Sequence, residues 1–166
     1  MNIKERVEEE GTVYIPWSET NPVFSWVKHR NVFRILLNIL VIWSTAYAPL
    51  RLKNFLYRHI LKVKIGKDSA LAPGVRLDYV YPDLIEIGDD VIVGQDAVIL
   101  THEYMQDHLR FGKVHIEDGA CVGAKSIVRS GVTIGEKAVL GIGSMAHKDI
   151  GEGEVWVGRP MQRLKR

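Results

Sequence analysis

Six histidines occur in this chain of 166 residues, and one of them stands where a rigid element could aim it. His102 directly follows an expected strand at 98–101 and begins the polar stretch HEYMQDHLRFGK. The ordinary pKa of a histidine ring lies near neutral pH, so the ring can accept a proton from a reacting group and later return it. His102 is therefore the candidate general base. The other five lie in expected helices, in or just after the polar stretch, or late in the chain: His29, His59, His108, His115 and His147.

The element that would position His102 is a repeat with a period of six residues, which runs from Ile65 to Val157. A helix would need apolar spacings of three and four, so this period excludes one. A small or β-branched residue and the next aliphatic residue are two apart, and they point to one face of a short strand. Such a period indicates a β-helix whose coils stack on one another. The aliphatic positions are Ile65, Leu71, Leu77, Ile87, Val93, Ile99, Ile116, Val122, Val128, Ile134 and Leu140.

Two insertions interrupt this period. The step from Leu77 to Ile87 takes ten residues, so the segment DYVYPDL must bulge from a corner. The period fails again after Ile99 and returns at Ile116, so the polar stretch 102–113 is expected to leave the coils as a loop. Insertions in stacked repeats often lie on the binding face.

The amino-acid composition limits which partners the protein could bind and which cellular compartment suits it. The net charge of +2 is too small to indicate nucleic-acid binding, and no aromatic and basic residues alternate as such binding would require. The single cysteine, Cys121, excludes an intrachain disulfide and a cysteine-based zinc site. It suits a reducing, cytoplasmic compartment and is expected to be an inert residue that points outward.

The N-terminal part is expected to contain a helical hairpin. Residues 31–50 form the most apolar run, which is too short to span a bilayer comfortably, and residues 51–62 have a basic amphipathic pattern. The hairpin either caps the first coil or lies on the inner face of a membrane, with its basic residues toward anionic lipid. Three parts follow: an N-terminal tail and hairpin (1–62), a β-helix with its loop (63–158) and a basic C-terminal tail (159–166).

Two segments carry a resemblance to a known family. IGDDVIVGQDAVILTHEY (87–104) and VHIEDGACVGAKSIVRSGVTIGEKAVLGIGSMAHKD (114–149) resemble the hexapeptide-repeat acyltransferases, in the branch that includes the maltose and galactoside O-acetyltransferases. The resemblance extends from about Val63 to Pro160. It implies a mainly β fold, a left-handed parallel β-helix with three repeats per coil. It also implies a homotrimer whose active sites combine two subunits.

The resemblance further implies a reaction: transfer of acetyl from acetyl-CoA to a hydroxyl of a sugar or glycan. His102 aligns with the catalytic histidine of the family, and the backbone N–H of Ala124 aligns with its oxyanion donor. Asp78 and Asp83 lie where similar enzymes place groups that bind the acceptor. The group that orients His102 stays open between Asp78, Glu103 and a backbone carbonyl.

The coenzyme A site is likewise carried over from the family, and no metal is expected. Four consecutive residues align with backbone along the pantetheine arm, two with residues beside the pantetheine and phosphates, and two arginines could meet the phosphates. One departure puts the acceptor in doubt: Cys121 stands where the sugar acetyltransferases often have an aromatic residue. The aligned residues are Gly141, Ile142, Gly143, Ser144, His147, Lys148, Arg159 and Arg163.

Two functions other than acetyl transfer are also compatible with a β-helix. A γ-class carbonic anhydrase shares the β-helix and binds zinc through three histidines, for which His102, His108 and His115 could be nominated. Their spacing does not resemble that family. A non-catalytic trimer that anchors a partner or a membrane through its hairpin is the other alternative.

Overall fold

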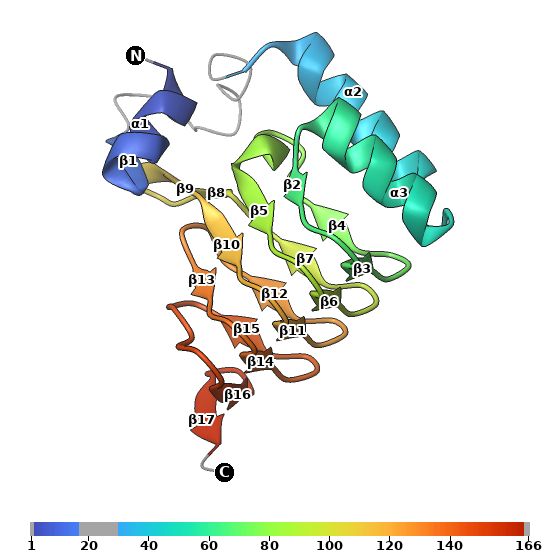
Figure 1. The fold of residues 1–166 in the computed structure, drawn as a ribbon. Coiled ribbons are helices and arrows are strands. Elements are labelled where there is room, and N and C mark those ends of the chain that lie inside the picture. Colours follow the sequence, from blue (N-terminus) through green and yellow to red (C-terminus); the bar gives the residue numbers. More distant parts are fainter. Residues whose placement is uncertain (1, 17–29, 165–166) are drawn as a thin grey trace.

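The computed structural model describes residues 2–16 and 30–164. Its main body is a prism with three faces, each a parallel sheet to which successive coils contribute one strand (Figure 1). This confirms the expected mainly β architecture of stacked six-residue repeats. The first face contains β2 (Lys64–Ile65), β5 (Ile85–Ile87), β10 (Val114–Ile116) and β13 (Thr133–Ile134). The second contains β3 (Ala70–Leu71), β6 (Ile92–Val93), β11 (Cys121–Val122), β14 (Val139–Leu140) and β16 (Val155–Val157). The third contains β4 (Arg76–Leu77), β7 (Val98–Ile99), β12 (Ile127–Val128) and β15 (Met145–Ala146).

The register of these sheets explains the six-residue period. On the first face Ile65 pairs with Ile87, Ile87 with Ile116 and Ile116 with Ile134, so one aliphatic column runs down the interior. All of its members are buried. Corresponding columns on the other two faces complete a single core. Each coil therefore buries its apolar side chains only because another coil lies above or below it.

The corners between the second and third faces require very small residues. A Cβ atom added to Gly94 would lie 2.4 Å from the backbone nitrogen of Ala124 in the next coil. Real Cβ atoms do not approach backbone that closely, so the coils can stack at this spacing only with glycine there. The same corner of the following coil repeats the contact, between Gly123 and Ile142 at 2.5 Å.

Two helices cover the open first coil. They are α2 (Val32–Ser44) and α3 (Leu50–Leu56), and α3 continues into one π-helical turn, η2 (Tyr57–Leu61). Val41, Ile42, Tyr57 and Leu61 pack into the core of the prism. The buried Lys53 ammonium donates to the carbonyls of Ala46, Leu71 and Ala72, at 2.9, 3.3 and 3.0 Å. The hairpin thus contacts the first coil through both apolar packing and hydrogen bonds.

No helix in the described ranges is both long and apolar enough to cross a membrane.

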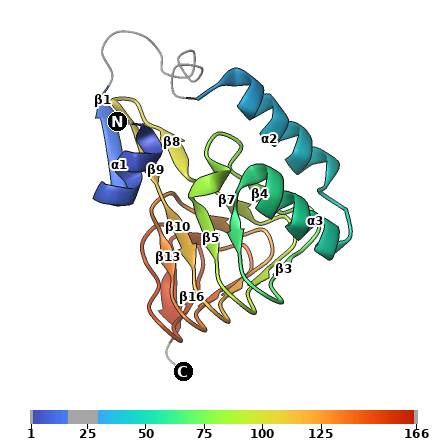
Figure 2. The ribbon, with the colours of Figure 1, turned by 45° about the horizontal axis from the view of Figure 1, so that its top comes forward.

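The polar stretch after His102 is not a loop, and in that respect the expectation was wrong. It forms a hairpin of β8 (His102–Tyr104) and β9 (His108–Gly112), and β1 (Thr12–Pro16) adds a third antiparallel strand. Helix α1 (Ile3–Glu10) lies beside this sheet (Figure 2). The physical reason is alternation: Leu109 and Phe111 turn inward and form a second core with Val7 and Val13.

The chain ends by folding back on the last coil. Strand β17 (Gln162–Leu164) pairs antiparallel with β16, so part of the basic segment 159–166 is a strand and not a free tail. Residues 165–166 lie outside the described ranges.

Candidate active site

His102 lies at the corner that follows the third face, where β8 leaves the second coil. Its ring atom Nδ1 is 2.5 Å from Oδ2 of Asp78, which occupies the same corner one coil earlier. The two residues are 24 positions apart in the sequence and meet because the coils stack. Of the three candidates for orienting His102, the structure places Asp78 against its ring.

Asp78 is buried, and both of its carboxylate oxygens are occupied. Oδ1 accepts from the backbone N–H groups of Val80 and Tyr81, at 2.8 and 3.0 Å. Oδ2 accepts from those of Thr101 and His102, at 2.9 and 3.1 Å. Burial would raise the pKa of Asp78, but the His102 ring and these N–H groups lower it to about 2. The carboxylate has no free position for an acceptor, so the expected acceptor-binding role of Asp78 does not fit this geometry.

The ionised Asp78 determines the tautomer of His102. A carboxylate can only accept, so Nδ1 of the neutral ring carries the proton, and the lone pair lies on Nε2. Burial would lower the pKa of His102, but the charge and hydrogen bond of Asp78 raise it above the ordinary value. A ring held in this orientation and made more basic is suited to take a proton at Nε2.

Aromatic side chains enclose the His102 ring, and the sequence analysis missed them. Tyr79 and Tyr104 meet it edge to face, with centroids 5.8 and 5.3 Å away, and Phe111 lies 6.3 Å away. Burial, Tyr79 and Asp78 raise the pKa of Tyr104 to about 12, and burial and Asp78 raise that of Tyr79. Both hydroxyls therefore stay protonated and can donate to a bound molecule. The available signal was a tyrosine directly after Asp78 and another two residues after His102.

A mostly apolar pocket of about 260 Å³ leads to His102. Ile39, Ile42 and Trp43 of α2 form one wall. The opposite wall comes from the third face and the first insertion: Arg76, Leu77, Asp78, Tyr79, Val98 and Leu100. A larger hollow of about 450 Å³ lies over the first face, but its lining does not include His102. We therefore take the smaller pocket as the candidate acceptor site.

Glu103 and Asp83 have other partners. Glu103 accepts from Arg129 Nε at 2.6 Å and from the Ser130 hydroxyl at 2.7 Å, so it holds the hairpin against the third coil. Asp83 pairs with Arg30 at 2.8 Å and with Lys4 at 3.5 Å, which ties N-terminal segments to the first insertion. Asp83 is thus engaged in ion pairs and was not found in the lining of the pocket.

The residues expected to bind coenzyme A fall into two groups. One group lies at the corner between the second and third faces, and the other lies near the C-terminal end. Ala124 and Gly143 stack at the corner between the second and third faces, where the Gly143 N–H donates to the Ala124 carbonyl at 2.8 Å. Arg159 joins this edge through a 3.0 Å bond to the Lys125 carbonyl. Gly141 and Ile142 belong to the same corner. His102 lies on the edge at the far side of the third face, so one chain does not bring it together with Ala124.

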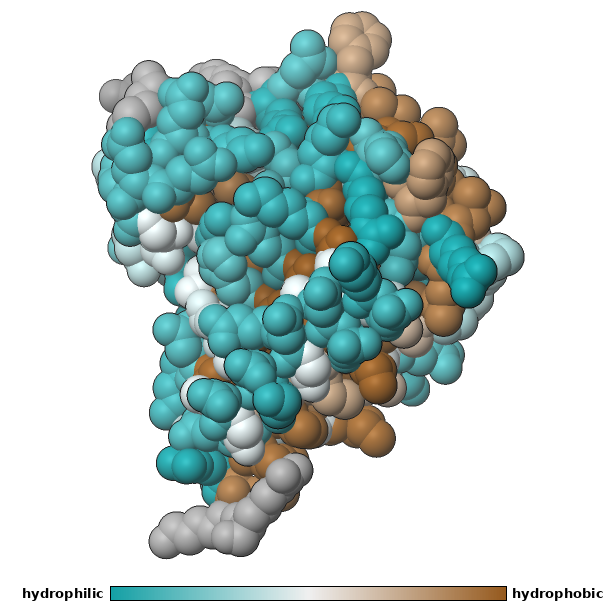
Figure 3. Space-filling model, viewed as in Figure 1, coloured by the Kyte–Doolittle hydropathy of each residue, from teal (hydrophilic) through white to brown (hydrophobic). Residues whose placement is uncertain are grey.

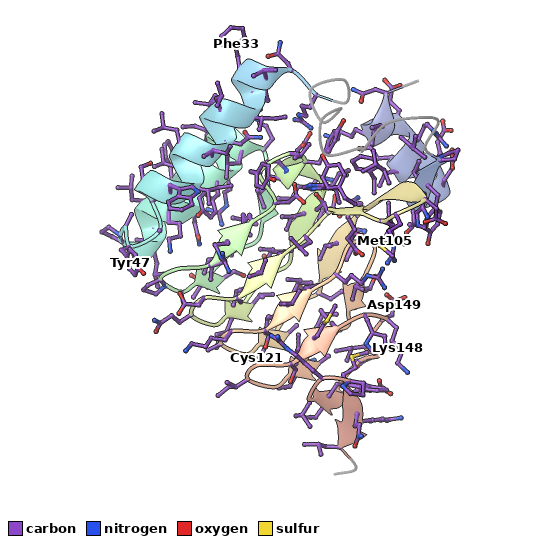
Figure 4. The ribbon with its side chains drawn as sticks, turned by 180° about the vertical axis from the view of Figure 1, so that it is seen from behind. Phe33, Tyr47, Met105, Cys121, Lys148 and Asp149 are labelled. Carbon is purple, nitrogen blue, oxygen red and sulfur yellow. The ribbon has the colours of Figure 1, made fainter. Side chains whose placement is uncertain are left out.

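The remaining coenzyme A candidates lie near the C-terminal end. His147 and Lys148 are exposed, and the Lys148 ammonium lies 4.5 Å from the centroid of the Trp156 ring (Figure 4). The Ser144 hydroxyl is buried and accepts from the Gly158 N–H at 2.8 Å, so only its backbone could meet a ligand. Arg163 pairs with Glu154 at 2.9 Å. Lys148 is therefore the best placed cation of this set.

The three histidines nominated for zinc each pair with a different carboxylate. His102 contacts Asp78, His108 lies 2.6 Å from Asp107, and His115 lies 3.1 Å from Glu86. Within residues 2–16 and 30–164, no three side chains of metal-binding type gather around one point. The geometry gives the carbonic anhydrase alternative no support.

Comparison with known sequences identifies relatives over most of the chain. A family profile described as "Hexapeptide repeat of succinyl-transferase" matches residues 113–145. The Bacillus subtilis protein named "Putative acetyltransferase YvoF" is 35% identical over 148 residues, which cover 89% of this chain and 86% of that protein.

Solved structures agree on the fold. A galactoside acetyltransferase in complex with coenzyme A superposes with a TM-score of 0.65 at 16% identity, covering 100% of this chain and 91% of that one. An acetyltransferase of Vibrio cholerae, VCA0836, complexed with acetyl coenzyme A, gives 0.64 at 18% identity, covering 88% and 98%. The left-handed β-helix expected from the sequence is confirmed. With the extensive identity to YvoF, these findings show that the chain belongs to the hexapeptide-repeat acyltransferases.

Proposed function

We propose that this protein transfers acetyl from acetyl-CoA to a hydroxyl of a sugar or glycan in the cytoplasm, with His102 as general base. The observation that carries the proposal is the His102–Asp78 pair at the end of a pocket. Two proteins of the same fold hold coenzyme A or acetyl-CoA, which supports the choice of donor. The single cysteine suits the compartment.

The reaction begins when Nε2 of His102 takes the proton of the acceptor hydroxyl. The oxygen attacks the thioester carbonyl, a C–O bond forms, and negative charge develops on the carbonyl oxygen. The C–S bond then breaks, and the leaving thiolate takes the proton from His102. Asp78 holds the ring in place throughout, and Tyr79, which lines the pocket, can donate its hydroxyl hydrogen to the acceptor. The Ala124 N–H is the candidate donor to the oxyanion.

We propose a homotrimer, since His102 and the Ala124 edge lie apart in one chain. Outward side chains support it: the first face is polar, with Lys64, Glu86 and His115, whereas the second and third are largely apolar. A neighbouring copy that covered them would also bring its Ala124 edge toward His102. Light scattering is expected to give three copies, and an active monomer at micromolar concentration would overturn the proposal. The apolar outward residues are Ala70, Ile92, Val98, Cys121, Ile127, Val139, Met145 and Val155.

Replacement of Lys148 by alanine tests the coenzyme A site. Its ammonium lies over the Trp156 ring but makes no ion pair within the described residues, and it is exposed. Lys148→Ala is therefore expected to weaken acetyl-CoA binding about threefold to tenfold, with kcat little changed at saturation. Titration calorimetry with acetyl-CoA measures this affinity. Lys137→Ala removes another exposed cation and serves as the control, because Lys137 lies at a different corner. Equal affinity in both variants would place the phosphates elsewhere.

A further inference from the structure

Helices α2 and α3 expose a broad apolar surface, here called the cap face. Phe33 is 82% exposed, Leu40 64% and Trp43 77%. Figure 3 shows part of this surface as a mainly hydrophobic area at the upper right, with hydrophilic side chains beside it. Figure 4 shows Phe33 and Tyr47 at opposite ends of the region, both pointing away from the coils. The cap face consists of Val32, Phe33, Leu36, Leu37, Leu40, Trp43, Tyr47, Leu50, Leu52 and Phe55.

The cap face is not the side with which these helices cover the prism. Ile35, Val41 and Ile42 on the opposite side of α2 are buried together with Asn38, so α2 carries large apolar side chains on both of its sides. A helix of that kind needs cover on both sides, and a contiguous exposed patch of large apolar residues marks an interaction site. The prism covers one side of the hairpin, and within residues 2–16 and 30–164 the cap face stays exposed.

The charge of the residues around the cap face indicates which kind of partner covers it. Residues 20–67 contain nine lysines and arginines and no aspartate or glutamate, whereas the rest of the chain has a net charge of −7. Around the cap face, Arg51, Arg58 and Lys62 are exposed. An apolar surface bordered mainly by positive charge complements a hydrocarbon layer with anionic headgroups.

A basic cavity of about 520 Å³ lies directly beside the cap face. Leu50 belongs to both. The charged residues of the lining are Arg51, Arg58, Lys67 and one carboxylate, Asp68, so positive charge is in excess. Arg58 is fixed by a 2.9 Å bond to the Ile65 carbonyl, whereas the side chains of Arg51 and Lys67 make no ion pair within the described residues. Two cations thus remain available for a phosphate that sits next to an apolar surface.

We propose that the cap face docks on an anionic lipid bilayer, with α2 and α3 lying in the interface and a lipid phosphate in the basic cavity. Apolar side chains enter the boundary between headgroups and acyl chains, and the bordering cations add electrostatic attraction to the anionic headgroups. Capping and membrane contact are then functions of opposite sides of the same helices.

Docking would also place the acceptor pocket at the membrane. Trp43 belongs to the cap face and lines the pocket that leads to His102. If the proposed function holds, the acceptor hydroxyl belongs to a lipid-anchored molecule, such as a glycan on an isoprenoid or glycerolipid, because its apolar part can stay in the bilayer. Binding to vesicles is independent of that function.

The test is co-sedimentation of the full-length protein with vesicles of phosphatidylglycerol and phosphatidylcholine. We expect binding at low salt, release by salt, and much weaker binding to phosphatidylcholine alone. Lipids brominated in the acyl chain should quench Trp43, and this part of the quenching should disappear in Trp43→Phe. Phe33→Ser combined with Leu40→Ser should weaken vesicle binding at least about tenfold, since two apolar side chains leave the interface. Leu164→Ser, on an exposed leucine at the opposite end of the prism, should not.

Failure to bind anionic vesicles at low salt would overturn the proposal, as would equal binding by the double variant. A double variant that changes its oligomeric state and not its vesicle binding would show that another copy of the chain covers the cap face. Acetyl-CoA affinity, measured on the same samples, separates the two proposals. Lost vesicle binding with intact acetyl-CoA binding leaves the proposed function standing.

Discussion

Replacing His102 by alanine is expected to lower kcat by roughly 10²- to 10⁴-fold, the usual contribution of a general base. Acetyl-CoA affinity should change little, because the expected coenzyme residues lie on other corners or at the C-terminal end. His102 is buried among Tyr79, Tyr104 and Phe111, so the fold must be checked by thermal melting. Steady-state kinetics with saturating acetyl-CoA and a hydroxyl acceptor measure the effect.

The matched control is His115→Ala. His115 also lies beside a carboxylate, Glu86, but on the first face and away from the pocket. Its removal should leave kcat within about twofold. Near-normal turnover in His102→Ala would show that another group takes the proton.

Asp78→Asn is expected to lower kcat by about 10²-fold or more, because the Asp78 carboxylate holds the His102 ring in place. The amide introduced by this substitution could donate to Nδ1, and it would no longer fix the tautomer with the lone pair on Nε2. The Asp78 carboxylate raises the pKa of His102, so the substitution should lower that pKa. The acidic limb of the kcat/KM profile, where His102 loses its proton, should then move to lower pH. A merely structural role would reduce activity without moving this limb.

Asp83→Asn is the control for this shift. Both carboxylates belong to the insertion DYVYPDL, and both are largely buried, but Asp83 pairs with Arg30 and Lys4. The same pH profile is measured for this variant, and its acidic limb should stay in place. A limb that moves equally in both variants would contradict the assignment of Asp78 as the positioning residue.

The six-residue period was enough to predict the coils, because nearly every strand of the coils places an aliphatic side chain in the interior. It also placed His102 at the end of a strand. It could not choose Asp78 over Glu103 as the partner of His102. Glu103 is the neighbour in sequence, but the strand carries its side chain toward Arg129 and Ser130 of the third coil. Asp78 reaches the ring only through stacking of the coils.

Long-range pairing explains the main errors in the prediction. The stretch 102–113 has a polar composition typical of a loop, yet Leu109 and Phe111 alternate and find a second core when β1 pairs with β9. Nothing within the stretch itself shows that an N-terminal strand is available. The division of the expected coenzyme residues between two edges of the prism was equally hidden, since it depends on which corner each repeat occupies.

The most direct test of the central claim is analysis of the product formed from acetyl-CoA and a panel of sugars, glycans and lipid-linked glycans. Mass spectrometry of the acceptors, with release of free coenzyme A followed in the same reactions, compares the wild-type protein with His102→Ala. The account predicts an O-acetyl ester that hydroxylamine cleaves, formed in step with coenzyme A release and nearly absent in the variant. An amide product, or an ester formed equally well by His102→Ala, would contradict it.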